Sequence, residues 1–178
     1  MQLVKFNIDK AKMWPFVFVK HIDQVLKIEM LSFERPWISE EFRYFSEQKN
    51  TNTEVVIFNS EVVGYILWEN LSRTSTLRIV NFAVDPRYRC QGIGKLLLKK
   101  LTDKIARELH REILLEVRET NVEAQNYFFK RGFRAISNLR GHFLDTKESA
   151  ILFRYYMIPE EQVPFVPENR IRHLLSSR

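Results

Sequence analysis

The chain has 178 residues, of which 45% are hydrophobic and 28% charged, and its formal net charge is +6 at pH 7. This length and composition predict one globular domain with a substantial core; they exclude an intrinsically disordered chain and disfavour two full-sized domains. The positive charge favours anionic partners without choosing among a nucleotide-like cofactor, nucleic acid and a membrane surface.

The single cysteine, Cys90, excludes an intramolecular disulfide and a cysteine-based zinc site, and it is consistent with a reducing compartment such as the cytoplasm. With four histidines as well, no metal-ligand cluster is visible, and we expect no metal. The longest early apolar run, residues 13–19, is broken by Pro15 and is too short to cross a bilayer. We therefore expect no membrane association.

The N-terminal half mixes extended and helical patterns. An extended apolar segment over residues 16–19 comes first, and a helix over residues 22–32 follows because its apolar residues recur at helical spacing. Ser39 precedes acidic residues, which predicts a second helix with a polar N-cap. Two strands over residues 55–58 and 62–68 are joined by a short polar turn, which predicts a hairpin.

A further strand over residues 76–84 runs into a loop that contains Gly92 and Gly94. The helix after this loop has the clearest pattern of the chain, because apolar side chains lie on one face and charged side chains on the other. The apolar face consists of Leu97, Leu98, Leu101, Ile105 and Leu109.

The remaining elements complete a single α/β domain. They are a strand over residues 113–117, a helix over residues 121–131 that ends at Gly132, and strands over residues 133–136 and 150–157. The order β-α-α-β-β-β-α-β-α-β-β predicts one mixed sheet of about seven strands with about four helices.

The two ends differ from this pattern. Residues 1–15 match no motif and are interpreted as an N-terminal extension of a domain that spans residues 1–158. Residues 159–178 contain three prolines followed by basic residues, and they are interpreted as an appended, mobile tail. Because the tail does not interleave aromatic and basic residues, we expect no specific nucleic-acid partner.

The segment at residues 89–94, Arg-Cys-Gln-Gly-Ile-Gly, lies between a strand and the long helix. Unpaired amides and the dipole at the start of a helix favour an anion, so we predict a phosphate here. The segment lacks both the Lys-Ser/Thr ending of a P-loop and the GxGxxG dinucleotide fingerprint. The alternative is a glycine-rich turn without a ligand.

Residues 89–94 resemble the Gln/Arg-x-x-Gly-x-Gly/Ala pyrophosphate signature of the GNAT N-acetyltransferases. The Leu-Glu-Val-Arg-x-x-Asn run that starts at Leu115 and continues to Gly132 and Phe133 resembles that of the ribosomal-protein-alanine N-acetyltransferases. Segments around Glu29 and Trp37 are similar to the substrate loops of that family, and the resemblance spans about residues 16–158.

The resemblance implies a GNAT fold, in which a largely antiparallel mixed sheet splays between its fourth and fifth strands. It also implies acetyl transfer from acetyl-CoA to the α-amine of a protein or peptide N-terminus, such as that of a ribosomal protein. The two substrates would react directly in a ternary complex, in an enzyme that is a monomer or a weak dimer.

The resemblance further implies the residues of the site. The cofactor would be bound by Phe82, Ala83, Val84, Arg89, Cys90, Gln91, Gly92, Ile93, Gly94, Lys95, Asn121 and Phe128. The acceptor would be bound by Phe33, Pro36, Trp37 and His142. A backbone donor on the strand over residues 82–84 would stabilise the oxyanion of the tetrahedral intermediate.

Glu116 is the candidate general base. An α-amine has a pKa of about 7.7–8.0, so much of it is protonated at neutral pH and must lose a proton before it attacks the thioester. Glu116 interrupts an apolar strand, where partial burial disfavours the charged carboxylate and makes it a better base. The alternative is an ion pair with Arg118, two residues along on the same strand face.

The sequence departs from the family at one catalytic position. The tyrosine that protonates the leaving thiolate falls at Phe128, and a tyrosine occurs only one residue earlier, at Tyr127. Adjacent helical residues point about 100° apart, so Tyr127 does not simply replace the missing phenol. Tyr127 remains a candidate general acid, with core packing as the alternative; water, Tyr155, Tyr156 and His142 are the other candidates.

Two other functions fit the same sequence. One keeps the fold and changes the acceptor to a small amine or a lysine side chain. The other is a CoA-binding regulatory protein with little turnover, for which Phe128 is the argument in favour and Glu116 the argument against.

Overall fold

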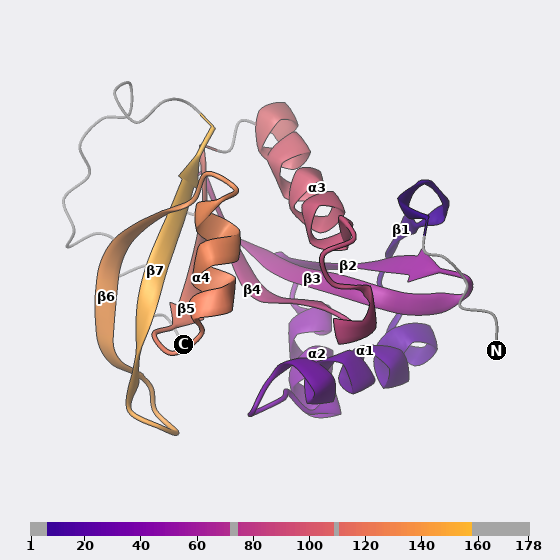
Figure 1. Ribbon diagram of the computed structural model, residues 1–178, viewed down its shortest axis with the longest axis horizontal. Helices are drawn as coiled ribbons and strands as arrows, with labels where there is room; N and C mark the ends of the chain where they lie inside the picture. The colour runs from indigo at the N-terminus through magenta and orange to yellow at the C-terminus, as the bar shows by residue number, and fades with distance from the viewer. Residues whose placement is uncertain (1–6, 72–74, 109–110, 158–178) are drawn as a thin grey trace.

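The computed structural model describes residues 7–71, 75–108 and 111–157, and within them one seven-stranded sheet carries helices on both faces (Figure 1). The strand order is β1-β2-β3-β4-β5-β7-β6. Neighbouring strands are antiparallel except for β4 and β5, which are parallel. The predicted mixed, largely antiparallel sheet is confirmed; the expected tail, residues 159–178, lies outside the described residues.

The elements follow the predicted order. The strands are β1 Lys12–Pro15, β2 Thr51–Phe58, β3 Glu61–Leu71, β4 Thr76–Val84, β5 Glu112–Arg118, β6 Arg134–Phe143 and β7 Glu148–Tyr156. The helices are α1 Phe18–Ser32, α2 Ser39–Glu47, α3 Ile93–Glu108 and α4 Val122–Phe129, with 3₁₀ turns at Ile8–Lys10 and Pro86–Tyr88. Among the described residues, no helix is long and apolar enough to span a membrane.

The hairpin between β2 and β3 is confirmed. Its two turn residues, Asn59 and Ser60, have φ values of 50° and 67°. Positive φ at both central positions matches the right-handed twist of the flanking strands. The predicted β4 also has the bounds that the structure gives it.

The first strand was predicted in the wrong place. It covers Lys12–Pro15 and pairs with β2, so part of the expected N-terminal extension belongs to the sheet. Phe18, which we had placed in the strand, is instead the first residue of α1. Pro15 stands at the end of an edge strand, where its missing N–H costs no ladder hydrogen bond.

The capping of α2 also differs from the prediction. The N-cap is Ile38, and Ser39 is the first helical residue. The carboxylate of Glu41 accepts the Ile38 backbone N–H at 2.8 Å, so the acidic first turn does the capping.

Two apolar cores lie on the two faces of the sheet. The face under α3 and α4 includes Val56, Ile66 and Leu97, whereas the face under α1 and α2 includes Val55 and Tyr65. Consecutive residues of β2 and β3 therefore enter opposite cores, as the two-residue period of a strand requires. The buried side of α3 matches the predicted apolar face, except that Leu109 lies outside the described residues.

Strands β4 and β5 pair at their beginning and then separate. They pair only from Thr76 opposite Glu112 to Ile79 opposite Leu115, whereas β5 pairs with β7 along its whole length. On its other side β4 has a bulge at Val80, where its pairing with β3 shifts register. The two halves of the sheet, β1–β4 and β5–β7, turn apart beyond this point (Figure 1). The predicted splay is thus present, and beyond Ile79 and Leu115 the facing edges of β4 and β5 have no ladder partner in each other.

Candidate active site

Glu116 is the first residue of β5 beyond the last β4–β5 pair, so it stands where the two strands separate. Its neighbours Leu115 and Val117 pack in the core under α3 and α4, which turns the Glu116 side chain to the opposite face, the face of α1 and α2. The carboxylate therefore lies at the opening between the strands.

Glu116 is paired with His142 and not with Arg118. His142 Nε2 lies 2.7 Å from Glu116 Oε2, and the two side chains are 29% and 15% exposed. The other carboxylate oxygen, Oε1, is enclosed and has no hydrogen-bond partner within the described part of the chain. The alternative that we weighed for Glu116, an ion pair with Arg118, is therefore wrong.

A distortion of β6 brings His142 to Glu116. Leu139 pairs with Ala150 and Phe143 with Glu148, so three residues of β6 stand opposite one residue of β7. Gly141, within the extra residues, has a φ of 60°, a left-handed conformation that glycine adopts at little cost. Bulges of this kind re-aim side chains, and here the bulge places the imidazole beside β5.

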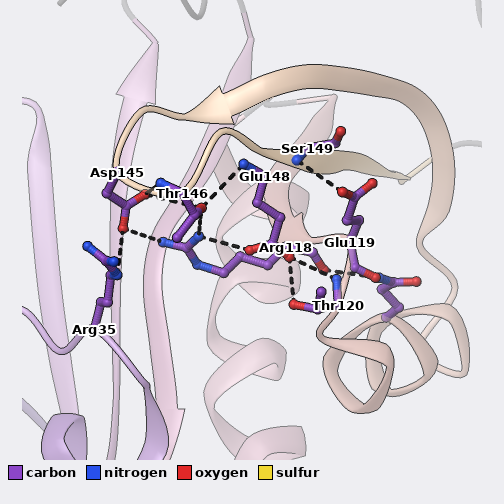
Figure 2. A network of polar contacts seen from close by, with 9 residues as sticks. Arg35, Arg118, Glu119, Thr120, Asp145, Thr146, Glu148 and Ser149 are labelled. Atoms are coloured by element: carbon purple, nitrogen blue, oxygen red, sulfur yellow. Dashed lines mark hydrogen bonds and ion pairs between the residues drawn. The ribbon is translucent and has the colours of Figure 1, made fainter.

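Arg118 instead joins a polar network at the end of β5 (Figure 2). Its guanidinium donates to Thr146 at 3.1 Å, Glu148 at 3.0 Å and Asp145 at 3.3 Å, and it lies over the Phe143 ring. Phe143 follows His142 directly, so the network fixes the segment that carries the imidazole.

The same network reaches the loop between α1 and α2. Arg35 of that loop lies 3.2 Å from Asp145, the residue that also contacts Arg118. The pKa of Asp145 is lowered, since the cations Arg118 and Arg35 outweigh its desolvation. The pKa of Glu148 is lowered chiefly by the hydrogen bond from the Thr120 hydroxyl. The ion pair between Arg35 and Asp145 thus joins the α1–α2 loop to the segment between β6 and β7.

A second buried carboxylate, Glu29, was missed as a functional candidate. It lies on α1 and is only 1% exposed; the Tyr65 hydroxyl and the Asn81 side-chain amide both donate to its Oε1. Its Oε2 accepts the backbone N–H of Trp37 at 3.2 Å. Burial raises the pKa of Glu29, and these hydrogen bonds act against that rise. The signal in the sequence was a carboxylate on the apolar face of a predicted helix.

Glu29 positions the α1–α2 loop, and this leads to a prediction for Glu29→Gln. A glutamine that keeps its oxygen toward Asn81 turns its NH₂ toward the Trp37 N–H, so two donors face each other. We expect a loss of about 1–3 kcal/mol in unfolding free energy and a raised KM for the amine acceptor. Urea unfolding and steady-state kinetics measure both, with Glu34→Gln, an exposed residue of the same loop, as control. An unchanged KM for the acceptor would contradict this role.

The predicted acceptor residues divide into two groups. Trp37 stacks on Phe45 with ring centroids 4.9 Å apart, so its ring packs within the helical layer. Phe33, the C-cap of α1, is half-buried against the same core, and Pro36 is half-buried beside it. His142 alone of the four contacts Glu116.

The loop before α3 has the backbone that the predicted anion site requires. Cys90 and Gly92 have φ values of 59° and 94°, and Cys90 is exposed. Helix α3 begins at Ile93, so the amides of its first turn have no helical partner. The loop is reached through the end of β4, Phe82, Ala83 and Val84, which pairs with β3 but not with β5. Lys95 is exposed on the first turn of α3.

Two predicted cofactor residues of this loop turn back toward the protein. Arg89 donates to the Val84 carbonyl and to Ser32 Oγ, both at 3.2 Å, and Gln91 donates to the Arg87 carbonyl at 3.2 Å. Their contacts shape the loop, and the backbone amides are what it presents to an anion.

Asn121 and Phe128 occupy the two ends of α4. Asn121 is the N-cap, and its Oδ1 accepts the Ala124 N–H at 3.0 Å. Phe128 is buried between Phe82 and Phe133, so the position of the family's tyrosine contributes an apolar ring to the core next to β4.

Tyr127 lies against the start of α3. A Cβ on Gly94 would overlap its hydroxyl and lie 3.0 Å from its Cζ. The hydroxyl is enclosed and makes no hydrogen bond within the described part of the chain, while Arg131 lies over the ring. Burial raises the pKa of Tyr127, and Arg131 offsets this only partly. A general acid works best with a pKa near the operating pH, so this environment favours the packing role.

We therefore expect Tyr127→Phe to keep the wild-type kcat. Removing a buried hydroxyl without a partner leaves the ring packing intact, so stability should be unchanged or raised by about 1 kcal/mol. Steady-state acetyl transfer and urea unfolding test this. A fall in kcat of about 10²-fold with unchanged stability would restore Tyr127 as the general acid.

The fold and these residues match a known enzyme family. Residues 22–133 match the family model described as "Acetyltransferase (GNAT) family", which covers more than half of the chain. The chain belongs to the GNAT acetyltransferase family. It is an acetyl-CoA-dependent acyltransferase, as the resemblance implied.

Similar proteins include N-terminal acetyltransferases. An N-alpha-acetyltransferase from Sulfurisphaera tokodaii is 31% identical, with 74% of this chain and 85% of that protein covered. The ribosomal protein bS18-alanine N-acetyltransferase of Escherichia coli K12 is 28% identical, with 70% and 84% covered. The crystal structure of the Escherichia coli ribosomal-protein-S18-alanine N-acetyltransferase has a TM-score of 0.73 at 22% identity, with 87% and 99% covered. The predicted GNAT fold is thereby confirmed.

No group of three or more His, Cys, Asp or Glu side chains within the described ranges is arranged to hold a metal ion. The polar groups at the opening of the sheet are carboxylates, an imidazole and main-chain amides. Such a set suits acid–base chemistry and anion binding.

Proposed function

We propose that this enzyme transfers the acetyl group of acetyl-CoA to the α-amino group of a protein or peptide N-terminus. The observation that carries the proposal is the position of Glu116. Its carboxylate lies where β4 and β5 separate, and it contacts the imidazole of His142, not the guanidinium of Arg118. The N-terminal acetylation named for the similar proteins supports the same acceptor class.

The residues around the opening fit acetyl-CoA. Free main-chain groups of β4 beyond Ile79 suit an amide-containing arm, which hydrogen-bonds like an additional strand. The first-turn amides of α3 suit the pyrophosphate, together with Gly92, which is exposed and has a φ of 94°. We propose that Asn121 and Phe128 contact the arm from α4.

The chemistry then needs a base and an oxyanion donor. The base that removes a proton from the acceptor ammonium includes Glu116, and a main-chain N–H of residues 82–84 stabilises the oxyanion. The thiol of CoA has a pKa near 8.5 by comparison with cysteine, so its thiolate leaves without a strong acid. Phe128 therefore lowers the rate without abolishing the reaction.

The finer proposal is an alanine N-terminus of a ribosomal protein, as in the Escherichia coli relative. The two arginines near the site, Arg118 and Arg35, form ion pairs within the network. They therefore give no indication of the charge that the acceptor peptide carries. The acceptor sequence is thus best found by experiment.

A mass-spectrometric assay tests the function. Wild-type protein, acetyl-CoA and a panel of peptides with different free N-terminal residues are compared with an N-blocked peptide that contains lysine. We expect acetylation of α-amines, with Ala-starting ribosomal peptides favoured. Transfer only to the lysine peptide or to small amines would replace the proposed acceptor. Binding of acetyl-CoA without transfer to any amine would favour the regulatory alternative.

A further inference from the structure

The arrangement around Glu116 engages one of its carboxylate oxygens with His142 and encloses the other. Oε1 is enclosed, with an accessible area below 1 Å², and Oε2 is bonded to His142 at 2.7 Å. His142 is the more exposed of the two side chains, at 29% against 15%.

The orientation of the imidazole decides which of its nitrogens is basic. Nε2 faces a carboxylate oxygen of Glu116, and we assign the tautomer in which Nε2 donates its proton to that oxygen. Nδ1 then holds a lone pair, and it is neither enclosed nor bonded to any residue in the described part of the chain. A carboxylate that orients an imidazole and stabilises its protonated form is an arrangement that other enzymes use for proton transfer.

We propose that the base of this enzyme is the Glu116–His142 pair, in which Nδ1 of His142 takes the proton of the acceptor amine. Glu116 holds the ring and stabilises the imidazolium. The proposal rests on the proposed function and deepens it, because it assigns the proton acceptor to a residue of β6. His142 is then a catalytic residue, and Glu116 acts on the acceptor through it.

The proton balance of this step is complete. The acceptor ammonium gives one proton to Nδ1, and the neutral amine attacks the thioester carbonyl so that a C–N bond forms. When the C–S bond breaks, the second proton leaves the same nitrogen and ends on the CoA sulfur. His142 then releases its proton to solvent, so that an ammonium and acetyl-CoA become an amide, CoA thiol and one proton.

The charged side chains near His142, other than Glu116, form ion pairs with one another. Glu116 faces it from β5 at 2.7 Å, and the nearest ionic cluster consists of Arg118, Asp145, Glu148 and the loop residue Arg35. Phe143 lies between, since its ring contacts both His142 and Arg118. Glu116 is therefore the carboxylate that contacts the imidazole directly.

The test uses His142→Ala, His142→Gln and Glu116→Gln in the full chain, with the preferred amine acceptor. We expect both His142 variants to lose about 10²-fold or more in kcat/KM while acetyl-CoA binding stays unchanged. Gln keeps a donor for Glu116 but accepts no proton at neutral pH, so it should not restore activity. Leu144→Ala, a neighbouring position whose side chain is 90% exposed, is the matched control for disturbance of the segment.

Chemical rescue separates a catalytic from a structural role. Imidazole added to His142→Ala should raise the rate with the concentration of its free base and leave the wild type unaffected. Full activity of His142→Ala, or of His142→Gln, overturns the pair and leaves Glu116 acting alone. A low rate in His142→Ala without rescue also overturns it, in favour of a positioning role.

Failure of the proposed function has a different signature. If the wild type acetylates only lysine or small amines, the acceptor is wrong, and the same variants test the pair with that amine. If the wild type acetylates no amine at all, both proposals fail. A hydrogen-bonded imidazole proton seen by NMR in the wild type, shifted upfield in Glu116→Gln because a neutral amide replaces the carboxylate, and lost in His142→Gln, reports the contact itself. Its absence in the wild type counts against the pair.

Discussion

Replacing Glu116 with glutamine should lower kcat/KM for acetyl transfer by about 10²- to 10⁴-fold, the range that general acid–base catalysis contributes. Glutamine has nearly the same shape and still reaches His142, so the packing at the opening of the sheet is kept. It carries no negative charge, so it does not stabilise the base after that base has taken a proton from the acceptor ammonium. The binding of acetyl-CoA should be unchanged, because the proposed anion site lies in the loop before α3.

Steady-state kinetics and calorimetric titration with acetyl-CoA measure the two quantities. Glu112→Gln is the matched control, since Glu112 stands on the same face of β5 and bonds to Thr76 at 2.8 Å, within the paired part of β4 and β5. If Glu116→Gln retains wild-type kcat/KM, or if the control loses as much, Glu116 is not part of the base.

The second large effect is expected at Gly94. A glycine-to-alanine change within a helix ordinarily stabilises it by roughly 1 kcal/mol. Here the added methyl would overlap the Tyr127 hydroxyl and lie 3.0 Å from its Cζ, against a ring held by the core. Overpacking of this kind costs about 1–3 kcal/mol, so Gly94→Ala should destabilise the protein. It should also weaken acetyl-CoA binding, because α3 must shift where its first-turn amides meet the anion.

The double variant Gly94→Ala/Tyr127→Leu makes this prediction specific. The signature that residues 89–94 resemble admits alanine at the position of Gly94. Leucine has no atoms where the phenol meets Gly94, so it should recover most of the stability and the affinity. Urea unfolding and calorimetric titration of the four proteins give the coupling free energy. Additive effects, or a Gly94→Ala protein as stable as the wild type, would show that the contact is not tight.

The sequence alone predicted most elements because their signals are local. Residues 76–84 and the hairpin before them carry alternating and turn patterns that depend only on neighbouring residues, and the structure confirms both. The glycines at 92 and 94 with the following amphipathic helix likewise predicted a glycine-containing loop before α3, and Gly92 has a φ of 94° there. The first strand failed because residues 13–19 are apolar throughout and contain no periodicity that separates an edge strand from a helix start.

Local pattern also placed Glu116 on a strand, and family resemblance suggested its role, but neither identified its partner. The nearest opposite charge in sequence is Arg118, on the same strand face, and it binds residues of the β6–β7 segment instead. His142 is 26 positions from Glu116 and reaches it only through the bulge in β6. Buried Glu29 was likewise fixed by Tyr65 and Asn81 on two other strands.

The sequence by itself therefore determined the fold class, the glycine loop before α3, the strand position of Glu116 and the loss of the family's phenol at Phe128. Periodicity, turn residues and glycine positions act within a few residues, so they can be read along the chain. Only the tertiary structure decided that β4 and β5 separate just before Glu116, that His142 covers its carboxylate, and that Tyr127 fills the space above Gly94. These features depend on register, a bulge and side-chain packing between distant segments, which no local pattern encodes.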